Sequence, residues 1–164
     1  MINNFALFFR PKKIEEFSGQ KHLRDKKSPF FKLLKSGSMT HSLFFGPAGV
    51  GKTTLARIVA NELALPFYEL DATSIKVEEI RKILSQQKNA LQKPLIFIDE
   101  IHRLSKTQQE VLLLPMENHE AIIIGASTEN PYFVLSSGIR SRMMLFEFYA
   151  LKDEDLRQIV QKVQ

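Results

Sequence analysis

The chain has 164 residues, of which 44% are hydrophobic and 25% are charged, the size and composition of one globular domain with a buried core. It contains no cysteine, which excludes disulfides, thiolate metal sites and cysteine nucleophiles. The formal net charge of +5 permits a polyanionic partner without requiring one.

The first apolar stretch runs from Ile2 to Phe9. It has no basic region in front of it, and Arg10 and Pro11 follow too soon for a membrane span or a secretory signal. We therefore expect a cytoplasmic protein with no membrane partner.

Residues 1–40 are predicted to form an N-terminal strap and basic segment. The stretch 10–20 is typical of an irregular strap, and the apolar residues of 30–34 predict a short amphipathic helix that ends at 36–38. Two interpretations of the charge remain open, a solvated surface or a patch that faces nucleic acid. The basic residues are Arg10, Lys12, Lys13, Lys21, Arg24, Lys26, Lys27, Lys32 and Lys35.

The next stretch predicts a strand, a glycine-rich loop and a helix. Residues 42–45 are an apolar run, and 46–53 read G-P-A-G-V-G-K-T, which fits the phosphate-loop pattern at every fixed position. Apolar residues then recur at helical spacing from Leu55 to Leu63, before Pro66. The alternative is a glycine-rich turn that binds nothing, but the strand and helix on either side favour a nucleotide site.

The chemistry of this loop follows from its residue types. Gly46, Gly49 and Gly51 let the backbone turn its N–H groups towards a polyphosphate at the positive end of the helix dipole. Lys52 is predicted to reach the β- and γ-phosphates, and the Thr53 hydroxyl to ligate Mg²⁺.

Strands and helices alternate beyond the loop. Residues 67–70 predict a strand, 71–73 a turn, and 77–91 a helix that carries Leu91 and ends before Pro94. Residues 95–98 are uniformly apolar, as in a parallel strand covered on both faces. This order predicts an α/β three-layer sandwich with a parallel sheet.

Two carboxylates, Asp99 and Glu100, follow the apolar strand 95–98. Ligands of such sheets bind at the carboxyl ends of the strands, so both side chains are expected to face the phosphate loop. Asp99 would hold Mg²⁺ and Glu100 would activate a water molecule, which indicates hydrolysis rather than transfer to a bound acceptor. The alternative is a chance pair of charges at a strand end.

Two more apolar strands, predicted at 121–126 and 145–148, border polar residues. A hydroxyl after the first of them would lie between the loop and Asp99. Arg140 and Arg142 precede the second, where they could meet a neighbouring subunit or could be ordinary surface charges.

Together these motifs resemble the AAA+ ATPases of the clamp-loader and RuvB group. The motifs are R-P-K with F-x-G-Q, G-P-x-G-x-G-K-T-T, I-D-E-I-H-R, G-A-S-T-E-N-P and S-R before a strand. The T-E-N-P element is most similar to the replication-associated recombination protein A (RarA) family. The resemblance runs from Leu7 to Phe148 and implies a P-loop NTPase fold, the AAA+ large subdomain, with strand order 5-1-4-3-2.

The resemblance also assigns roles by motif position. Glu100, Thr128 and Arg142 would be catalytic, as the base, the sensor 1 residue and the arginine finger. Ser127 and Arg140 are the less favoured neighbours of the last two.

The cofactors implied are ATP and Mg²⁺, with Thr53 and Asp99 as the metal-binding residues. The strap would line the adenine pocket. The nucleotide-binding candidates are Gly46, Pro47, Ala48, Gly49, Val50, Gly51, Lys52, Thr53, Thr54, Pro11, Gln20 and Leu23.

The resemblance implies three parts: the strap 1–40, the AAA+ nucleotide-binding core 41–150, and the start of a helical lid at 151–164 that is cut short. We therefore expect a fragment that hydrolyses ATP weakly or not at all when alone.

The function implied for the parent protein is ATP hydrolysis in DNA repair and recombination at replication forks. Its partners would be ATP or ADP, forked or single-stranded DNA, replication proteins and further copies of itself. The alternatives are a sliding-clamp loader subunit, a RuvB-like Holliday-junction motor, or a nucleotide-binding module without turnover.

Overall fold

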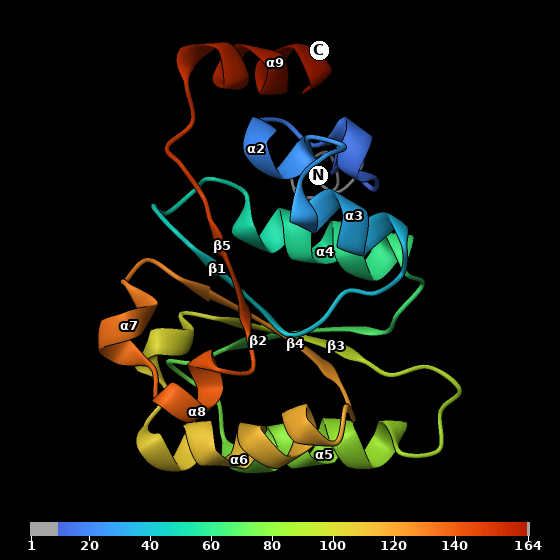
Figure 1. Ribbon diagram of the computed structural model, residues 1–164, viewed down its shortest axis with the longest axis vertical. Coiled ribbons are helices and arrows are strands. Elements are labelled where there is room, and N and C mark those ends of the chain that lie inside the picture. Colours follow the sequence, from blue (N-terminus) through green and yellow to red (C-terminus); the bar gives the residue numbers. More distant parts are fainter. Residues whose placement is uncertain (1–9, 164) are drawn as a thin grey trace, which may run out of the picture.

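The computed structural model describes residues 10–163, so the apolar stretch 2–9 lies outside the described residues. A five-stranded parallel sheet forms the centre, in the order β2-β3-β4-β1-β5 (Figure 1). This is the predicted order read from the other edge, which confirms the expected α/β architecture. The strands are β1 (Ser42–Phe45), β2 (Phe67–Asp71), β3 (Leu95–Asp99), β4 (Ile122–Ser127) and β5 (Met144–Glu147).

Helices cover both faces of the sheet (Figure 1). Alternate side chains of a strand point to opposite faces, so Phe44 packs on the side of α3 and α4 while Leu43 packs with α5, α6 and α8. Residues 95–98 of β3 are fully buried, as predicted for a central strand. The helical elements are η1 (Ile14–Glu16), α2 (Lys21–Arg24), α3 (Pro29–Lys35), α4 (Lys52–Glu62), α5 (Val77–Gln87), η2 (Ile101–Arg103), α6 (Lys106–Glu117), α7 (Pro131–Val134), α8 (Ser137–Arg140) and α9 (Asp153–Val163).

The strap is attached to α4. Asn61 Nδ2 donates to Lys12 O at 2.9 Å, and Glu62 Oε2 accepts from the Ile14 N–H at 3.1 Å. The other Glu62 oxygen lies 2.7 Å from Lys35 Nζ on α3. The helix that begins at the phosphate loop therefore also fixes the strap beside that loop. The division into three parts at 40 and 150 stays a prediction.

One predicted helix ends earlier than expected, and one observed helix was not predicted. Helix α5 ends at Gln87, and Leu91, predicted to lie on it, is fully exposed in the loop before β3. The apolar stripe stops at Leu84 because the next positions on that face are polar. Helix α6 was not predicted, although Ser105 and Gln108 form a capping box at its start. No helix formed by residues 10–163 has both the length and the apolar character needed to cross a membrane.

A buried histidine, His41, connects the start of β1 with α6 and β4, at the end of the sheet opposite the carboxyl ends of the strands. His41 is 4% exposed, its Nε2 lies 2.9 Å from Met116 O, and its Nδ1 accepts from the Ile123 N–H at 3.1 Å. His119 stacks on it with ring centroids 5.9 Å apart. Burial lowers the pKa of His41, the hydrogen bond with Met116 O opposes this, and the nearby His119 and Lys93 lower the pKa further.

We expect His41 to make the fold sensitive to acid. Its pKa is lower in the folded chain than the unfolded value of 6.5, so its contribution to stability is present above pH 6.5 and is lost as the pH falls towards the folded pKa. Urea unfolding of wild type and His41→Gln at pH 7.5 and 5.5 measures this. The wild type should lose more stability on acidification than the variant; equal losses would show that His41 does not contribute.

Candidate functional site

The phosphate loop connects the carboxyl end of β1 to the start of α4. Gly46 N–H donates to Ser127 O on β4 at 3.0 Å, and Gly46 has a φ of 151°. A side chain at this position would collide with Phe148 O, just after β5. The loop therefore begins in a space shared by β1, β4 and the exit from β5, which only glycine fits.

The start of α4 is shaped for an anion. Gly51 is the N-cap residue, with a φ of 104°, and a Cβ there would lie 2.7 Å from the Phe17 ring. The N-cap has no side-chain hydrogen bond within the described part of the chain. The first N–H groups of α4 are thus without a capping side chain, and the helix dipole favours negative charge there.

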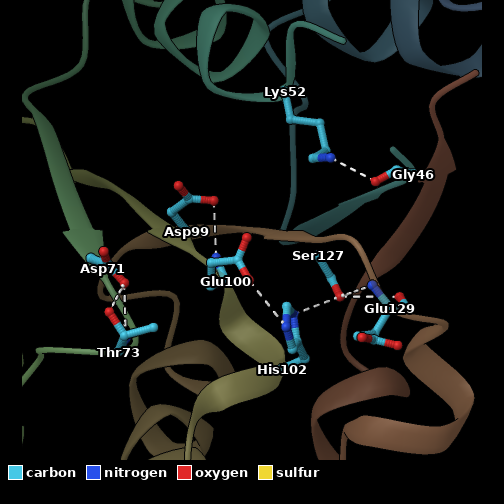
Figure 2. Close-up of polar contacts among 9 residues, drawn as sticks. All are labelled: Gly46, Lys52, Asp71, Thr73, Asp99, Glu100, His102, Ser127 and Glu129. Atoms are coloured by element: carbon cyan, nitrogen blue, oxygen red, sulfur yellow. Dashed lines mark hydrogen bonds and ion pairs between the residues drawn. The ribbon is translucent and has the colours of Figure 1, made fainter. Parts of the chain in front are cut away.

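Lys52 is the first residue of α4, and its side chain folds back onto the phosphate loop. Its Nζ donates to Gly46 O at 2.7 Å and to Pro47 O at 2.6 Å, and Figure 2 shows the side chain directed towards Gly46. Burial lowers the pKa of Lys52, and the nearby carboxylates of Asp99 and Glu100 oppose this. The loop carbonyls hold the ammonium at the place where an anionic ligand would compete for it.

A cavity of about 880 Å³ gathers many of the predicted residues, although Gly46 and Pro47 are not among the described residues that line it. Its wall includes 48–54 of the loop and α4, the carboxylates of Asp99 and Glu100 at the end of β3, and Thr128 after β4. Pro11 of the strap and Ile159 of α9 close it from the other side. The expectation that the carboxylates face the loop is met by this arrangement.

Two strap candidates lie behind the cavity wall rather than on it. Leu23 is buried in the core, and neither it nor Gln20 is among the described residues that line the cavity. Gln20 Nε2 donates to Tyr149 O at 2.7 Å and to Val50 O at 3.4 Å, and its Oε1 accepts from Tyr149 N–H at 2.9 Å. Gln20 thus ties the phosphate loop to the segment after β5.

A second tie connects the strap with α9. Lys162 Nζ donates to Glu16 O at 2.6 Å and to Ser18 Oγ at 2.9 Å. Lys162 and Ser18 both line the cavity. Helix α9 lies above α2 and the N-terminal strap in Figure 1.

The carboxylate pair is ordered by local contacts. Asp99 Oδ1 accepts from the Glu100 N–H at 2.9 Å. Glu100 Oε2 lies 3.1 Å from His102 Nε2, and His102 Nδ1 lies 3.0 Å from Ser127 Oγ (Figure 2). His102 was not among the predicted site residues. The signal available in the sequence was its position two residues after Glu100, which did not reveal the contact.

The two hydroxyls after β4 have different surroundings. Ser127 is buried, and its Oγ accepts from the Glu129 N–H at 3.0 Å besides contacting His102. Thr128 is exposed and lines the cavity. Of the two, Thr128 has the direct access to a ligand that a sensor residue needs.

The two candidate arginines make contacts elsewhere in their own chain. Arg142 donates to Gly138 O at 2.7 Å and pairs with Glu117 at the end of α6. Arg140 lies over the Tyr132 ring, 5.1 Å from its centroid. Neither is among the described residues lining the cavity.

The acidic residues do not form a metal cage. Within residues 10–163, no group of three or more histidine and carboxylate side chains could hold an ion. Thr53 and Asp99 line the same cavity and supply the hydroxyl and carboxylate oxygens that Mg²⁺ accepts. They fit a magnesium ion that takes its remaining oxygens from water and a bound phosphate.

Comparisons with known proteins agree with this geometry. Residues 9–137 match the family model of the Holliday junction DNA helicase RuvB P-loop domain. The replication-associated recombination protein A of Haemophilus influenzae is 35% identical over 160 residues, which cover 96% of this chain and 36% of that protein. The ATPase WRNIP1 of Dictyostelium discoideum is 38% identical over 156 residues, 93% of this chain and 18% of that protein.

Solved structures are also similar. The Thermotoga maritima RuvB Holliday junction branch migration motor superposes with a TM-score of 0.77 at 32% identity, covering 94% of this chain and 53% of that one. The chain spans about a third of the length of the replication-associated recombination proteins it matches.

Proposed function

The chain belongs to the RuvB P-loop domain family, and from this premise we propose that it is the ATP-binding and hydrolysing core of a AAA+ protein in replication-associated recombination. The observation that carries the proposal is the cavity in which the phosphate loop, the carboxylates after β3 and Thr128 meet. The similarity to replication-associated recombination protein A and to WRNIP1 supports the biological setting.

In this proposal the loop binds the phosphates of ATP. Lys52 moves from the carbonyls of Gly46 and Pro47 to the β- and γ-phosphates, and the N–H groups at the start of α4 complete the cradle. Thr53 and Asp99 hold Mg²⁺, which when bound neutralises charge on the phosphates. Pro11 contributes to the adenine side of the cavity, with Gln20 and Leu23 supporting that wall from behind.

Hydrolysis needs a base, a sensor and a positive charge opposite the γ-phosphate. Glu100 takes the proton of the attacking water, and Thr128 orients that water. Arg142 acts on the nucleotide of a neighbouring subunit, since it is not among the described residues that line its own cavity. These roles imply a homo-oligomer, with 151–164 as the beginning of a lid, in a cytoplasmic protein.

Turnover of ATP by the protein in its full native length tests the proposal. We expect stimulation by forked or gapped DNA that exceeds stimulation by a Holliday junction. The reverse preference would favour a RuvB-like motor, which the structural similarity makes the second candidate. Stimulation only by a sliding clamp on primed DNA would indicate a clamp loader, and binding without any turnover would leave a nucleotide-binding module.

Replacing Lys52 by alanine should weaken ATP binding about ten- to a hundred-fold or more, because it removes a charged partner of the phosphates. Titration with a fluorescent ATP analogue measures the affinity. Lys82→Ala, on the exposed face of α5, is the matched control and should bind as wild type does. Equal affinity of Lys52→Ala and wild type would remove the phosphate-loop assignment.

A further inference from the structure

We propose that His102 is a positioning residue that holds the Glu100 carboxylate and the turn carrying Thr128 in one hydrogen-bonded unit. The inference rests on the proposed function, because it concerns hydrolysis in the same cavity. It is carried by the chain of contacts from the end of β3 to the end of β4 (Figure 2).

The backbone after β3 brings His102 beside Glu100. Glu100 has a φ of 54° and a ψ of 41°, a left-handed conformation that is strained for a non-glycine residue. The turn η2 follows, and its Ile101 is fully buried against Gly125, where a Cβ would lie 2.6 Å from Ile101 Cδ1. Packing against β4 therefore holds the turn in place and offsets the backbone strain.

The proton positions follow from the partners. An ionised Glu100 carboxylate only accepts, so His102 Nε2 carries the proton and donates it. Nδ1 of the neutral ring is then an acceptor, and the Ser127 hydroxyl is its donor. Ser127 Oγ accepts from the Glu129 N–H, and its single proton has two acceptors at 3.0 Å, Glu129 O and His102 Nδ1. The proposed unit forms when the hydroxyl turns to Nδ1.

The two ends of this series of hydrogen bonds are next to the groups that act on the nucleotide, Glu100 and Thr128. His102 holds Glu100 Oε2, and Figure 2 shows the second oxygen pointing away from His102. That oxygen is the one available to take a proton from water. At the other end, the bond between Ser127 and Glu129 closes the turn that directs Thr128 to the cavity.

The imidazole is shielded from solvent, so water cannot readily replace it. The His102 side chain is 7% exposed, against 35% for Glu100. Without His102, the Glu100 side chain would sample other rotamers, and a displacement of about 1 Å in a catalytic group can cost ~10²-fold in rate. The effect belongs to the chemical step, because His102 is not among the described residues lining the cavity.

Variants of His102 that keep or remove the Nε2 donor test this in the full-length protein. His102→Gln puts an amide N–H near the position of Nε2 and keeps the bond to Glu100. His102→Asn reaches only the Nδ1 position and loses it. We expect kcat to fall about ten- to a hundred-fold in His102→Asn and His102→Ala, with KM for ATP and thermal stability little changed. His102→Gln should stay within about threefold of wild type.

A double-mutant cycle adds the Ser127 end. Ser127→Ala should lower kcat in wild type and lower it less in the His102→Ala background, because the contact between Ser127 and His102 is already lost there while the bond between Ser127 and Glu129 is not. His119→Asn, at an exposed histidine that is not among the described residues lining the cavity and whose left-handed backbone suits asparagine, is the control and should leave kcat unchanged.

Several results would overturn the proposal: unchanged kcat in His102→Asn, a raised kcat, failure of glutamine to rescue, or additive effects in the cycle. The proposed function fails on a different result, a wild-type protein that binds ATP without hydrolysing it.

Discussion

Replacing Arg142 by alanine should lower ATP turnover of the full-length protein about 10³- to 10⁵-fold, or about 4–7 kcal/mol, with little loss of ATP affinity. The reason is that Arg142 lies outside its own cavity and can stabilise charge only in the transition state of a neighbour's nucleotide. Its pairing with Glu117 is half exposed and costs little to break, because exposed ion pairs contribute about 0–1 kcal/mol.

Steady-state turnover and nucleotide titration of Arg142→Ala give the two numbers. Arg140→Ala is the matched control and should do much less, since its guanidinium lies over the Tyr132 ring. Residues 1–164 alone should bind nucleotide with little or no hydrolysis, because Arg142 of one copy would seldom meet the nucleotide of another.

Mixing variants gives the sharper test of action between subunits. Arg142→Ala subunits mixed with Lys52→Ala subunits should regain some activity, because one interface pairs an intact loop with an intact arginine. Mixtures that stay inactive while subunits demonstrably exchange would mean that Arg142 acts within its own chain or only structurally.

Glu100→Gln should bind ATP normally and hydrolyse it about 10²- to 10⁴-fold more slowly. The amide keeps the size and much of the hydrogen bonding of the side chain but cannot accept the proton of water. The left-handed backbone at this position suits glutamine no worse than glutamate, so the fold should be unaffected.

Single-turnover hydrolysis, measured beside the dissociation constant for ATP, separates binding from chemistry for this variant. Glu110→Gln, exposed on α6, is the control for the loss of one carboxylate. A Glu100→Gln protein with kcat within about threefold of wild type would mean that another group is the base.

The sheet and the loop were predictable because their signals are local. Uniform apolar runs mark β3 and β4 as buried parallel strands, and the loop pattern between β1 and α4 fixes the strand order through the family it indicates. Helix α6 was harder to predict. It contains Pro115, and its run of three leucines includes the exposed Leu114, so it carries no clean apolar stripe.

Contacts within the site depend on backbone geometry that composition does not reveal. The link between Glu100 and His102 requires the left-handed residue after β3, which the sequence does not mark with glycine or asparagine. The partner of Arg142, Glu117, lies 25 positions earlier on the helix that was missed. The identity of the site residues could be read from motifs, whereas their partners needed the fold.

Gly46 and Gln20 connect the phosphate loop to the segment after β5. Gly46 lies too close to Phe148 O to carry a side chain, and Gln20 donates to both Val50 O and Tyr149 O, so the loop and the segment after β5 are held together. That segment leads to α9, whose far end is fastened to the strap through Lys162. Helix α9 is therefore connected to the phosphate loop at its start, through Gln20 and the segment after β5, and to the strap at its end, through Lys162.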